Sequence, residues 1–511
     1  MPCPWDMAVA VDRMMGWAAT RASWFPAWVR GLAAAGLAFL FLGWGAWQLP
    51  LMDRDEPRFS EASREMLAGG DWVVPRLNGE HRFDKPPLIY WMQAASMACL
   101  GRNEGAVRLP SIVCALLTVV ATGLWTRRMA TPRAGVWAAM ILLTSPQFYV
   151  HAHLAVADMA MVLGFVMAGW CGWELLRPGR GPWVATGWYW GLLGSLAFGF
   201  LAKGPVAWLP VVPLAWAGWR RSGVGSDGRP GRRVRPWEVL LAVVVVLAWV
   251  GCWGIPALVR TQGEYWNIGM GKHVAARSVG VLEGHGLKGL LGYVGSLPFY
   301  LLTFPLGFLP WSPLLFQKLR ARAPWRSGDA TAGYVLGGTA LVFVVFTLVR
   351  TKLPHYTLPA FPWLAAWLGC ELDRGGMTSR AMARLAGGAA LVLGLLAGVV
   401  VPWASTRLIA HDMAKAAVPL LRPGMAVATL GFQEPSVYWY LRPDGGPWVR
   451  HLEDEPEAIR FMEEGGPRML VVSDSAVASR VAARFPDVRR GEAAGWNPVR
   501  GRRVTLWLLA R

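Results

Sequence analysis

The segment Leu240–Trp253 reads LLAVVVVLAWVGCW, and the segment Leu391–Trp403 reads LVLGLLAGVVVPW. Apolar runs of this kind alternate with short arginine-rich stretches along most of the 511 residues. Charged residues make up 16% of the chain, whereas soluble domains carry about 25%. The 31 tryptophans fit the aromatic belts that form at membrane interfaces. The sequence therefore predicts a polytopic α-helical membrane protein, and it excludes disordered, fibrous and disulfide-framework classes.

A membrane span needs about 20 mostly apolar residues, and about eleven segments meet this requirement. The predicted spans are residues 31–50, 107–126, 134–152, 157–176, 184–202, 204–219, 237–259, 289–316, 331–349, 355–372 and 385–404. The apolar segment Pro86–Leu100 is shorter and begins with two prolines. We therefore expect it to form a helix at the membrane interface.

The formal charge of +19 comes from 51 Lys and Arg residues against 32 Asp and Glu residues. In a nucleic-acid-binding protein this excess would gather on one soluble face, but here it stands between apolar segments. With eleven spans, all short basic loops fall on one side of the membrane, which the positive-inside rule identifies as cytoplasmic. We expect a cytoplasmic N-terminus (residues 1–30), a membrane domain (residues 31–404) and no nucleic-acid partner.

The opposite, outer face then holds a first loop (residues 51–106), a second loop (residues 260–288) and a tail (residues 405–511). Three short apolar runs in the tail predict buried strands, and one segment between them has helical composition. The strands are Met425–Leu430, Met469–Ser473 and Val504–Leu509, and the helix is Ala476–Phe485. The tail is therefore predicted to be a small periplasmic α/β domain.

The first outer loop begins with an unusual pair of acids. Asp55 and Glu56 follow the first span almost directly and precede a proline. Acids at this position contribute little to membrane topology or to solubility. A carboxylate there is suited to act as a general base or to bind a cation. By contrast, we expect Glu61, Arg64 and Glu65 to lie on a solvated amphipathic helix at the membrane surface.

Further charged residues lie at the edges of apolar segments. An ionised side chain deep in the bilayer costs about 2.5–3.5 kcal/mol or more, so Asp158 and Lys203 either face an interior cavity or anchor a helix end at the interface. Lys272 and His273, with Arg277 one turn later, are suited to hold a phosphate whose lipid tail lies in the bilayer. Tyr356 is either a hydroxyl donor at that site or an interfacial anchor.

Six motifs occur in an order that is more specific than any one of them. They are Asp55-Glu56-Pro57-Arg58, GDWVVP at residues 70–75, Phe83-Asp84-Lys85-Pro86, RLPS at residues 108–111, Ala202-Lys203-Gly204-Pro205 and KLPHYTLP at residues 352–359. In this order the sequence resembles polyprenyl-phosphate-dependent glycosyltransferases of the GT-C fold. It is similar to the 4-amino-4-deoxy-L-arabinose–lipid A transferases and to bacterial relatives of the dolichyl-phosphate-mannose–protein mannosyltransferases. The resemblance covers residues 30–370.

The resemblance implies a role for each matching residue. Asp55 would be the principal catalytic carboxylate, and Asp158 would belong to the same catalytic cavity. The residues implied to contact the donor phosphate or its sugar are Arg58, Lys85, Lys203, Arg277 and Tyr356, with Glu56 and Lys352 in supporting positions. The one cofactor that the resemblance suggests is a divalent metal ion, with Asp84 and His273 as its ligands. Asp84 stands where the arabinose transferases usually have Glu.

The implied activity is transfer of a sugar from undecaprenyl phosphate to an acceptor on the periplasmic side of a bacterial inner membrane. The resemblance favours an acceptor of the lipid A type, and the alternatives are a protein O-mannosyltransferase or another envelope-glycan transferase. A non-enzymatic lipid-phosphate carrier or flippase is a rival from another class, but the chain lacks the two similar halves that transporters often show. We expect no nucleotide site, because the sequence has no Gly-rich phosphate loop. The enzyme hypothesis requires residues 55, 85, 158 and 203 to share one pocket on one side of the membrane.

Overall fold

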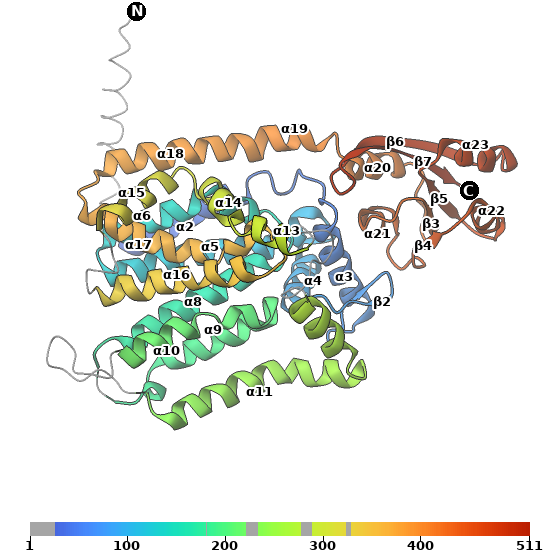
Figure 1. Ribbon diagram of the computed structural model, residues 1–511. Coiled ribbons are helices and arrows are strands. Elements are labelled where there is room, and N and C mark those ends of the chain that lie inside the picture. Colours follow the sequence, from blue (N-terminus) through green and yellow to red (C-terminus); the bar gives the residue numbers. More distant parts are fainter. Residues whose placement is uncertain (1–25, 180, 221–233, 277–288, 323–328) are drawn as a thin grey trace, which may run out of the picture.

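The computed structural model describes residues 26–179, 181–220, 234–276, 289–322 and 329–511. A bundle of helices makes up the larger part, and a five-stranded sheet with flanking helices makes up the C-terminal part (Figure 1). The architecture is therefore helical with a C-terminal α/β unit, as the sequence predicts.

The centre of the bundle is packed around a buried indole. Trp363 lies with its ring centroid 5.2 Å from that of Trp125 and 5.3 Å from that of Tyr334. Gly169 and Gly338 lie against the same indole, where an added Cβ would stand 2.2 Å from its ring atoms. The helices that form this core are α5 (Glu104–Met129), α6 (Pro132–Leu143), α8 (Asp158–Leu176), α9 (Gly187–Lys203), α16 (Ala330–Leu348) and α17 (Ala360–Arg374).

A second set of helices surrounds this core and exposes apolar side chains. Leu240 and Leu391, for example, are both 64% exposed, as expected for helices that face lipid. These helices are α2 (Ala27–Gly43), α10 (Val211–Arg220), α11 (Pro236–Arg260) and the continuous helix formed by α18 (Ser379–Leu395), η5 (Leu396–Val400) and α19 (Val401–Ser405). Shorter helices complete the described bundle: α7 (Pro146–Ala152), η1 (Trp183–Ala185), η2 (Pro205–Trp208), η3 (Tyr265–Ala276), α13 (Gly289–Ser296), α14 (Phe299–Gly307), α15 (Ser312–Arg322) and η4 (Pro354–Thr357).

Several of the predicted spans are long apolar helices. Within the described chain, five helices are long and apolar enough to cross a membrane, namely α5, α8, α11, α16 and the helix Ser379–Ser405. A sixth span results if Leu291–Gly307 and Ser312–Ala321, which meet at 114°, are taken together. Among the other predicted spans, residues 31–50 and 134–152 overlap the shorter apolar helices α2 and α6. The count of eleven spans stays a prediction.

The basic loops of the described bundle meet at one of its ends. Arg128 at the end of α5 forms an ion pair with Glu174 at the end of α8. Arg133 at the start of α6 forms an ion pair with Asp373 at the end of α17. These contacts join helix ends that the topology prediction assigns to the same side of the membrane.

The first outer loop lies at the other end, between the bundle and the sheet (Figure 1). It consists of α3 (Asp55–Gly69), the hairpin of β1 (Arg76–Leu77) and β2 (Glu80–His81), and α4 (Leu88–Leu100). The expectation of a solvated helix is wrong for α3, because Glu61, Arg64 and Glu65 are buried. The C-terminal unit covers this face of α3, and Arg442 pairs with both glutamates.

The C-terminal sheet has the strand order β4-β3-β5-β7-β6. The three predicted strands and the predicted helix are confirmed as β3 (Ala426–Leu430), β5 (Arg468–Val472), β7 (Arg502–Ala510) and α23 (Ser475–Arg484). The sequence analysis missed β4 (Arg450–Leu452), β6 (Arg489–Asn497), α20 (Ile409–Ala417), α21 (Ser436–Leu441) and α22 (Glu455–Glu463). Strands β3, β4 and β5 run parallel, while β7 is antiparallel to both β5 and β6.

Each face of the sheet has its own apolar core. Val427 and Val471 belong to the core that includes residues of α20 and α21, whereas the adjacent Ala428 and Leu470 belong to the core that includes residues of α22 and α23. This alternation follows from the two-residue period of a strand. Helix α21 of the C-terminal unit contacts α3. The C-terminal unit therefore lies against the helix that begins with Asp55.

Candidate active site

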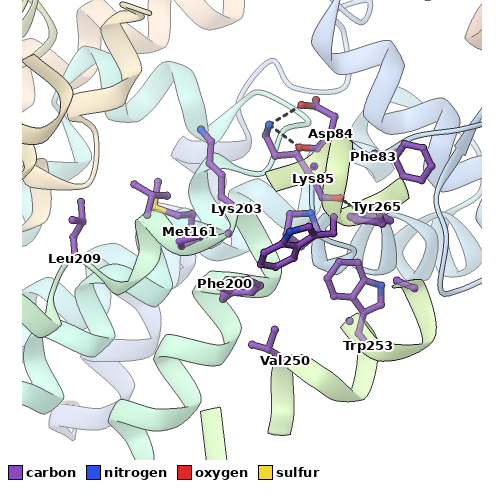
Figure 2. Close-up of a pocket in the computed structure, with 18 of the residues that line it drawn as sticks. Phe83, Asp84, Lys85, Met161, Phe200, Lys203, Leu209, Val250, Trp253 and Tyr265 are labelled. Carbon is purple, nitrogen blue, oxygen red and sulfur yellow. Dashed lines mark hydrogen bonds and ion pairs between the residues drawn. The ribbon is translucent and has the colours of Figure 1, made fainter. Parts of the chain in front are cut away.

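A cavity of about 630 Å³ opens between α9, α11, η3 and α16. Its walls are mainly apolar, with Phe200, Val250 and Trp253 among the lining residues (Figure 2). The lining residues with charged, imidazole or hydroxyl side chains are Asp84, Lys85, Lys203, Tyr265, His355 and Tyr356. Figure 2 shows the amines of Lys85 and Lys203 on the same side of the cavity, away from Val250 and Trp253. The shape and lining suit a ligand with a long apolar chain and an anionic head.

Lys85 is held at the cavity by the segment that follows the hairpin. Its Nζ donates a hydrogen bond to Asp84 Oδ1 at 2.9 Å. Its carbonyl oxygen accepts a hydrogen bond from the hydroxyl of Tyr265 at 2.5 Å, and the ring of Tyr265 packs edge-on against Phe83 at 5.3 Å. The backbone of Lys85 is therefore fixed by η3, while its amine remains next to an acid.

Lys203 and Asp158 form a buried ion pair between two helix ends. Lys203 is the last residue of α9 and Asp158 is the first residue of α8, and Lys203 Nζ lies 2.5 Å from Asp158 Oδ1. His355 Nε2 lies 3.9 Å from the same oxygen, and its ring stacks obliquely on that of His151 at 5.1 Å. Lys203 lines the cavity whereas Asp158 does not, so Asp158 stands behind the lysine.

Tyr356 also lines the cavity, close to Lys203. The lysine Nζ lies 5.9 Å from the centroid of the tyrosine ring, within the range of a cation–π contact. The ring of Phe346 packs against the ring of Tyr356, with a centroid distance of 5.1 Å. Tyr356 therefore lines the cavity, where its position suits both hydrogen bonding by its hydroxyl group and packing by its ring.

Asp55 lies at the first position of α3, where the helix dipole favours a negative charge. Its side chain is 71% exposed, and its Oδ1 lies 4.0 Å from Nη1 of Arg58, one turn further along the helix. Neither residue lines the cavity. Asp55 thus presents an accessible carboxylate beside an arginine, outside the cavity.

Glu56 points the other way, into the bundle. Its two carboxylate oxygens accept hydrogen bonds from Nε and Nη2 of Arg108, at 2.8 and 2.9 Å. It also accepts from the backbone N–H groups of Met52 and Ala155, both at 2.9 Å. Arg108 in turn donates to backbone carbonyls of the segment before α3. Glu56 therefore supports the site by anchoring the start of α3.

Arg82 contacts both Asp84 at the cavity and Phe59 in α3. The sequence analysis did not identify it as a site residue. Its Nε donates to the hydroxyl of Tyr90 at 3.0 Å, and its Nη2 donates to Asp84 Oδ2 at 3.1 Å. The guanidinium lies over the ring of Phe59 in α3, and the charge of Asp55 acts on both Arg82 and Tyr90. An arginine next to the Phe83-Asp84-Lys85 motif was the signal that could have pointed to it.

Lys352 is placed apart from the other lysines. Its Nζ donates to the carbonyl of Phe346 at 3.1 Å and to the carbonyls of Thr347 and Val349. Phe346 and Thr347 lie in the last turn of α16 and Val349 directly follows it, so the Lys352 ammonium caps the end of that helix. The geometry gives Lys352 a structural role next to the segment that carries Tyr356.

The predicted metal ligands and one predicted phosphate ligand are only partly described. Arg277 lies outside the described residues, and so does the side chain of His273. Asp84 is bound to Arg82 and Lys85 at the cavity. The described residues contain no group of three or more His, Cys, Asp or Glu side chains that could hold a metal ion.

Comparison with known proteins gives two kinds of sequence match. The family described as dolichyl-phosphate-mannose-protein mannosyltransferase matches residues 84–253. An undecaprenyl phosphate-alpha-4-amino-4-deoxy-L-arabinose arabinosyl transferase of Edwardsiella ictaluri is 31% identical over 391 residues, which are 72% of this chain and 66% of the relative. The protein of the same name from Pseudomonas aeruginosa PAO1 is 31% identical over 62% of this chain and 55% of the relative. The matches cover less than two thirds of the length of these relatives.

The fold is shared with a solved structure over nearly the whole chain. The crystal structure of ArnT from Cupriavidus metallidurans bound to undecaprenyl phosphate superposes with a TM-score of 0.72, at 21% identity, over 94% of this chain and 97% of that one. Its apo form gives a TM-score of 0.70. The sequence matches and the shared fold confirm the resemblance of the chain to polyprenyl-phosphate glycosyltransferases of the GT-C fold.

Proposed function

We propose that the chain is an integral inner-membrane glycosyltransferase, which transfers a sugar from undecaprenyl phosphate to an acceptor of the lipid A type on the periplasmic side. The observation that carries this proposal is the pair Lys85 and Lys203 at the edge of a cavity with apolar walls. A polyprenyl phosphate has the matching form, with an anionic head on a long apolar chain. The names of the arabinosyl transferase relatives support the choice of donor.

The reaction requires attack of an acceptor oxygen on the anomeric carbon, as the bond from that carbon to the phosphate oxygen breaks. The leaving group is the lipid phosphate, whose growing negative charge would be stabilised by the lysine amines. Lys85 and Lys203 are therefore assigned to the donor phosphate. Arg58 and Tyr356 are assigned to the donor sugar or its phosphate, and Arg277 stays a predicted phosphate ligand.

Asp55 is assigned to the acceptor. If the acceptor oxygen belongs to a hydroxyl group, the Asp55 carboxylate would take its proton as a general base. If it belongs to a phosphate, the oxygen is already ionised, and Asp55 would orient groups or stabilise the positive charge that develops on the sugar. Asp158 is bound to Lys203 and stands behind it, which favours a role in positioning that lysine. A metal ion held by Asp84 and His273 remains part of the proposal, and no step depends on it.

The proposal includes a topology. Eleven spans in residues 31–404 would place residues 1–30 in the cytoplasm, and residues 405–511 would form a periplasmic domain. The ion pairs Arg128–Glu174 and Arg133–Asp373 support it, because they gather basic loops at one end of the described bundle. The positive-inside rule assigns that end to the cytoplasm.

The description of the matching family favours a second candidate, a protein O-mannosyltransferase. Both candidates would use the same donor site and differ in the acceptor. The deciding experiment is mass spectrometry of lipid A and of envelope glycoproteins from cells with and without the gene. A sugar lost from lipid A supports the first candidate, and a sugar lost from proteins supports the second.

The purified protein provides the complementary test. In detergent with an undecaprenyl-phosphate sugar and lipid A, it should release undecaprenyl phosphate and form modified lipid A. Movement of the lipid across proteoliposomes without cleavage of the sugar–phosphate bond would instead identify a carrier and overturn the proposal.

A further inference from the structure

The exposed acid Asp55 lies between two neighbouring acids that are anchored in opposite directions. Asp53 Oδ1 accepts a hydrogen bond from the backbone N–H of Ser436 at 2.9 Å, and its Oδ2 accepts one from the Ser436 hydroxyl at 2.7 Å. Glu56 is bound to Arg108 in the bundle. The segment that carries Asp55 is thus tied to the C-terminal unit on one side and to the bundle on the other.

Other residues of α21 and the segment after it extend this contact along the chain. The hydroxyl of Tyr440 accepts a hydrogen bond from the backbone N–H of Leu51 at 2.8 Å. Arg442 Nη1 lies 2.9 Å from Glu61 Oε1, and the carbonyl of Arg442 accepts from Arg64 Nη1 at 3.0 Å. Contacts from residues 436–442 therefore reach both sides of Asp55, and Ser436 makes the one nearest to it in sequence.

The Asp55 side chain has little packing of its own to hold it. It is 71% exposed, and its ion pair with Arg58 spans 4.0 Å, the outer limit of such a contact. Its position is set instead by the backbone between Asp53 and Glu56. Because an error of about 1 Å in a reacting group can reduce the rate about a hundredfold, this backbone needs to be fixed.

We propose that Ser436 is a positioning residue for the reaction: by holding Asp53, it fixes the Asp55 carboxylate next to the donor site. The inference rests on the proposed function, in which Asp55 acts on the acceptor. It also gives the C-terminal unit a part in catalysis, since the active site is complete only when α21 lies against the start of α3.

The test compares three variants of the full-length protein in detergent, with an undecaprenyl-phosphate sugar and lipid A as substrates. In Ser436→Ala we expect kcat to fall about ten- to a hundredfold. The KM for the donor should stay within about twofold, because the lysines of the donor site lie on other elements. Ser436→Thr keeps a hydroxyl donor and should restore most of kcat. Ser479→Ala is the matched control, because the Ser479 hydroxyl is exposed and bonds within α23.

Hydrogen–deuterium exchange of the peptide covering residues 51–58 gives a readout that needs no activity. Exchange should be faster in Ser436→Ala than in the wild type, and it should be unchanged in Ser479→Ala. Unchanged exchange and a kcat within twofold of the wild type in Ser436→Ala would overturn the inference, as would a Ser436→Thr variant as impaired as the alanine. A wild-type protein that transfers no sugar would instead refute the proposed function, and the exchange measurement would still decide whether Ser436 fixes this segment.

Discussion

Lys203 Nζ and Asp158 Oδ1 lie 2.5 Å apart, joining the last residue of α9 to the first residue of α8. Both side chains are largely buried, and only the lysine lines the cavity. Removing one partner of a buried pair leaves an uncompensated charge and costs about 3–5 kcal/mol. This ion pair therefore stabilises the bundle, and its lysine also supplies a positive charge to the donor site.

We predict that Asp158→Asn lowers the melting temperature of the detergent-solubilised protein and weakens donor use. The double variant Asp158→Leu/Lys203→Met should be more stable than Asp158→Asn, because an apolar pair often replaces a buried ion pair without loss of stability. It should not regain donor use, since the amine is gone. Thermal unfolding and the donor KM measure the two effects separately. Recovery of both in the double variant would contradict the assignment, and the exposed Lys415→Met is the control.

Lys85 and Lys352 provide a matched comparison of two lysines near the site. Lys85→Ala should raise the donor KM about ten- to a hundredfold, the effect of one lost hydrogen bond to a charged group. Lys352→Met should lower the melting temperature, because Lys352 caps α16, while the donor KM changes little. Steady-state kinetics and thermal unfolding of both variants test this pair. A donor KM that rises in Lys352→Met and stays constant in Lys85→Ala would reverse the two roles.

Asp55→Asn should reduce kcat while leaving the protein folded and the donor KM unchanged. If the acceptor is a hydroxyl group, loss of the general base should cost about 10²–10⁴-fold in rate. If the acceptor is a phosphate, no base is needed and the loss should be smaller. The side chain is exposed, so we expect no change in the melting temperature. Full activity of Asp55→Asn would remove Asp55 from the reaction.

Much of the site could be predicted from the sequence, because an isolated ionised side chain at the edge of an apolar run is costly. Such side chains pair with one another or face a polar cavity. This reasoning brought Lys85, Asp158 and Lys203 to one side of the membrane, and the structure places them at or behind one cavity. Asp55 lies outside that cavity and is linked to it through Arg82. The expectation of one shared pocket therefore holds for the two lysines, whereas Asp158 stands behind Lys203 and Asp55 lies outside the cavity.

The contacts that were not predicted involve residues far apart in sequence. Asp53 and Ser436 are separated by 383 positions, and nothing local to either one points to the other. A long separation in sequence also explains why the burial of Glu61 was not predicted. Its spacing suits a solvated helix, but the C-terminal unit covers it and Arg442 pairs with it. Strand β6 was missed because its sequence, RRGEAAGWN, is polar and half-exposed.

Arg108 was a detectable signal of a buried contact, since an arginine at the start of a span needs an internal partner. Arg108→Met would leave Glu56 buried without a cation, at a cost of about 3–5 kcal/mol. Arg108→Lys keeps the charge but cannot reproduce the two parallel hydrogen bonds, so an intermediate melting temperature is expected. A melting temperature of Arg108→Met equal to that of the wild type would show that this pair does not stabilise the start of α3.

Two acids beside α21, the half-buried Asp53 and the buried Glu65, contribute to the pH dependence of stability. Burial raises the pKa of Asp53 from 3.8 to about 6, against the hydrogen bonds from Ser436, which lower it. The carboxylate of Glu434 raises this pKa further, while the guanidinium of Arg58 lowers it. Asp53 therefore keeps its proton in the folded protein at pH values where the unfolded chain has lost it.

Glu65 behaves in the same way on the neighbouring face of α3. Burial raises its pKa from 4.5 to about 7, and the charge of Glu61 adds to this effect. The N–H groups of Asn78 and Gly79 and the charge of Arg442 lower the pKa and only partly offset the burial. A shift of two pKa units corresponds to about 2.7 kcal/mol, so the two acids together have a measurable effect on folding.

At these two carboxyl groups the folded protein binds more protons than the unfolded chain between about pH 4 and pH 7, so their contribution to the free energy of unfolding should fall as the pH rises through this range. Relative to the Asp53→Asn/Glu65→Gln double variant, the wild type should therefore have a lower melting temperature at pH 8 than at pH 5. Each single variant should remove part of this difference, because an amide does not titrate. The exposed Glu453→Gln should leave it unchanged. If the Asp53→Asn/Glu65→Gln double variant keeps the wild-type slope, the two acids do not carry the pH dependence, and the contact between α21 and α3 is insensitive to their protonation.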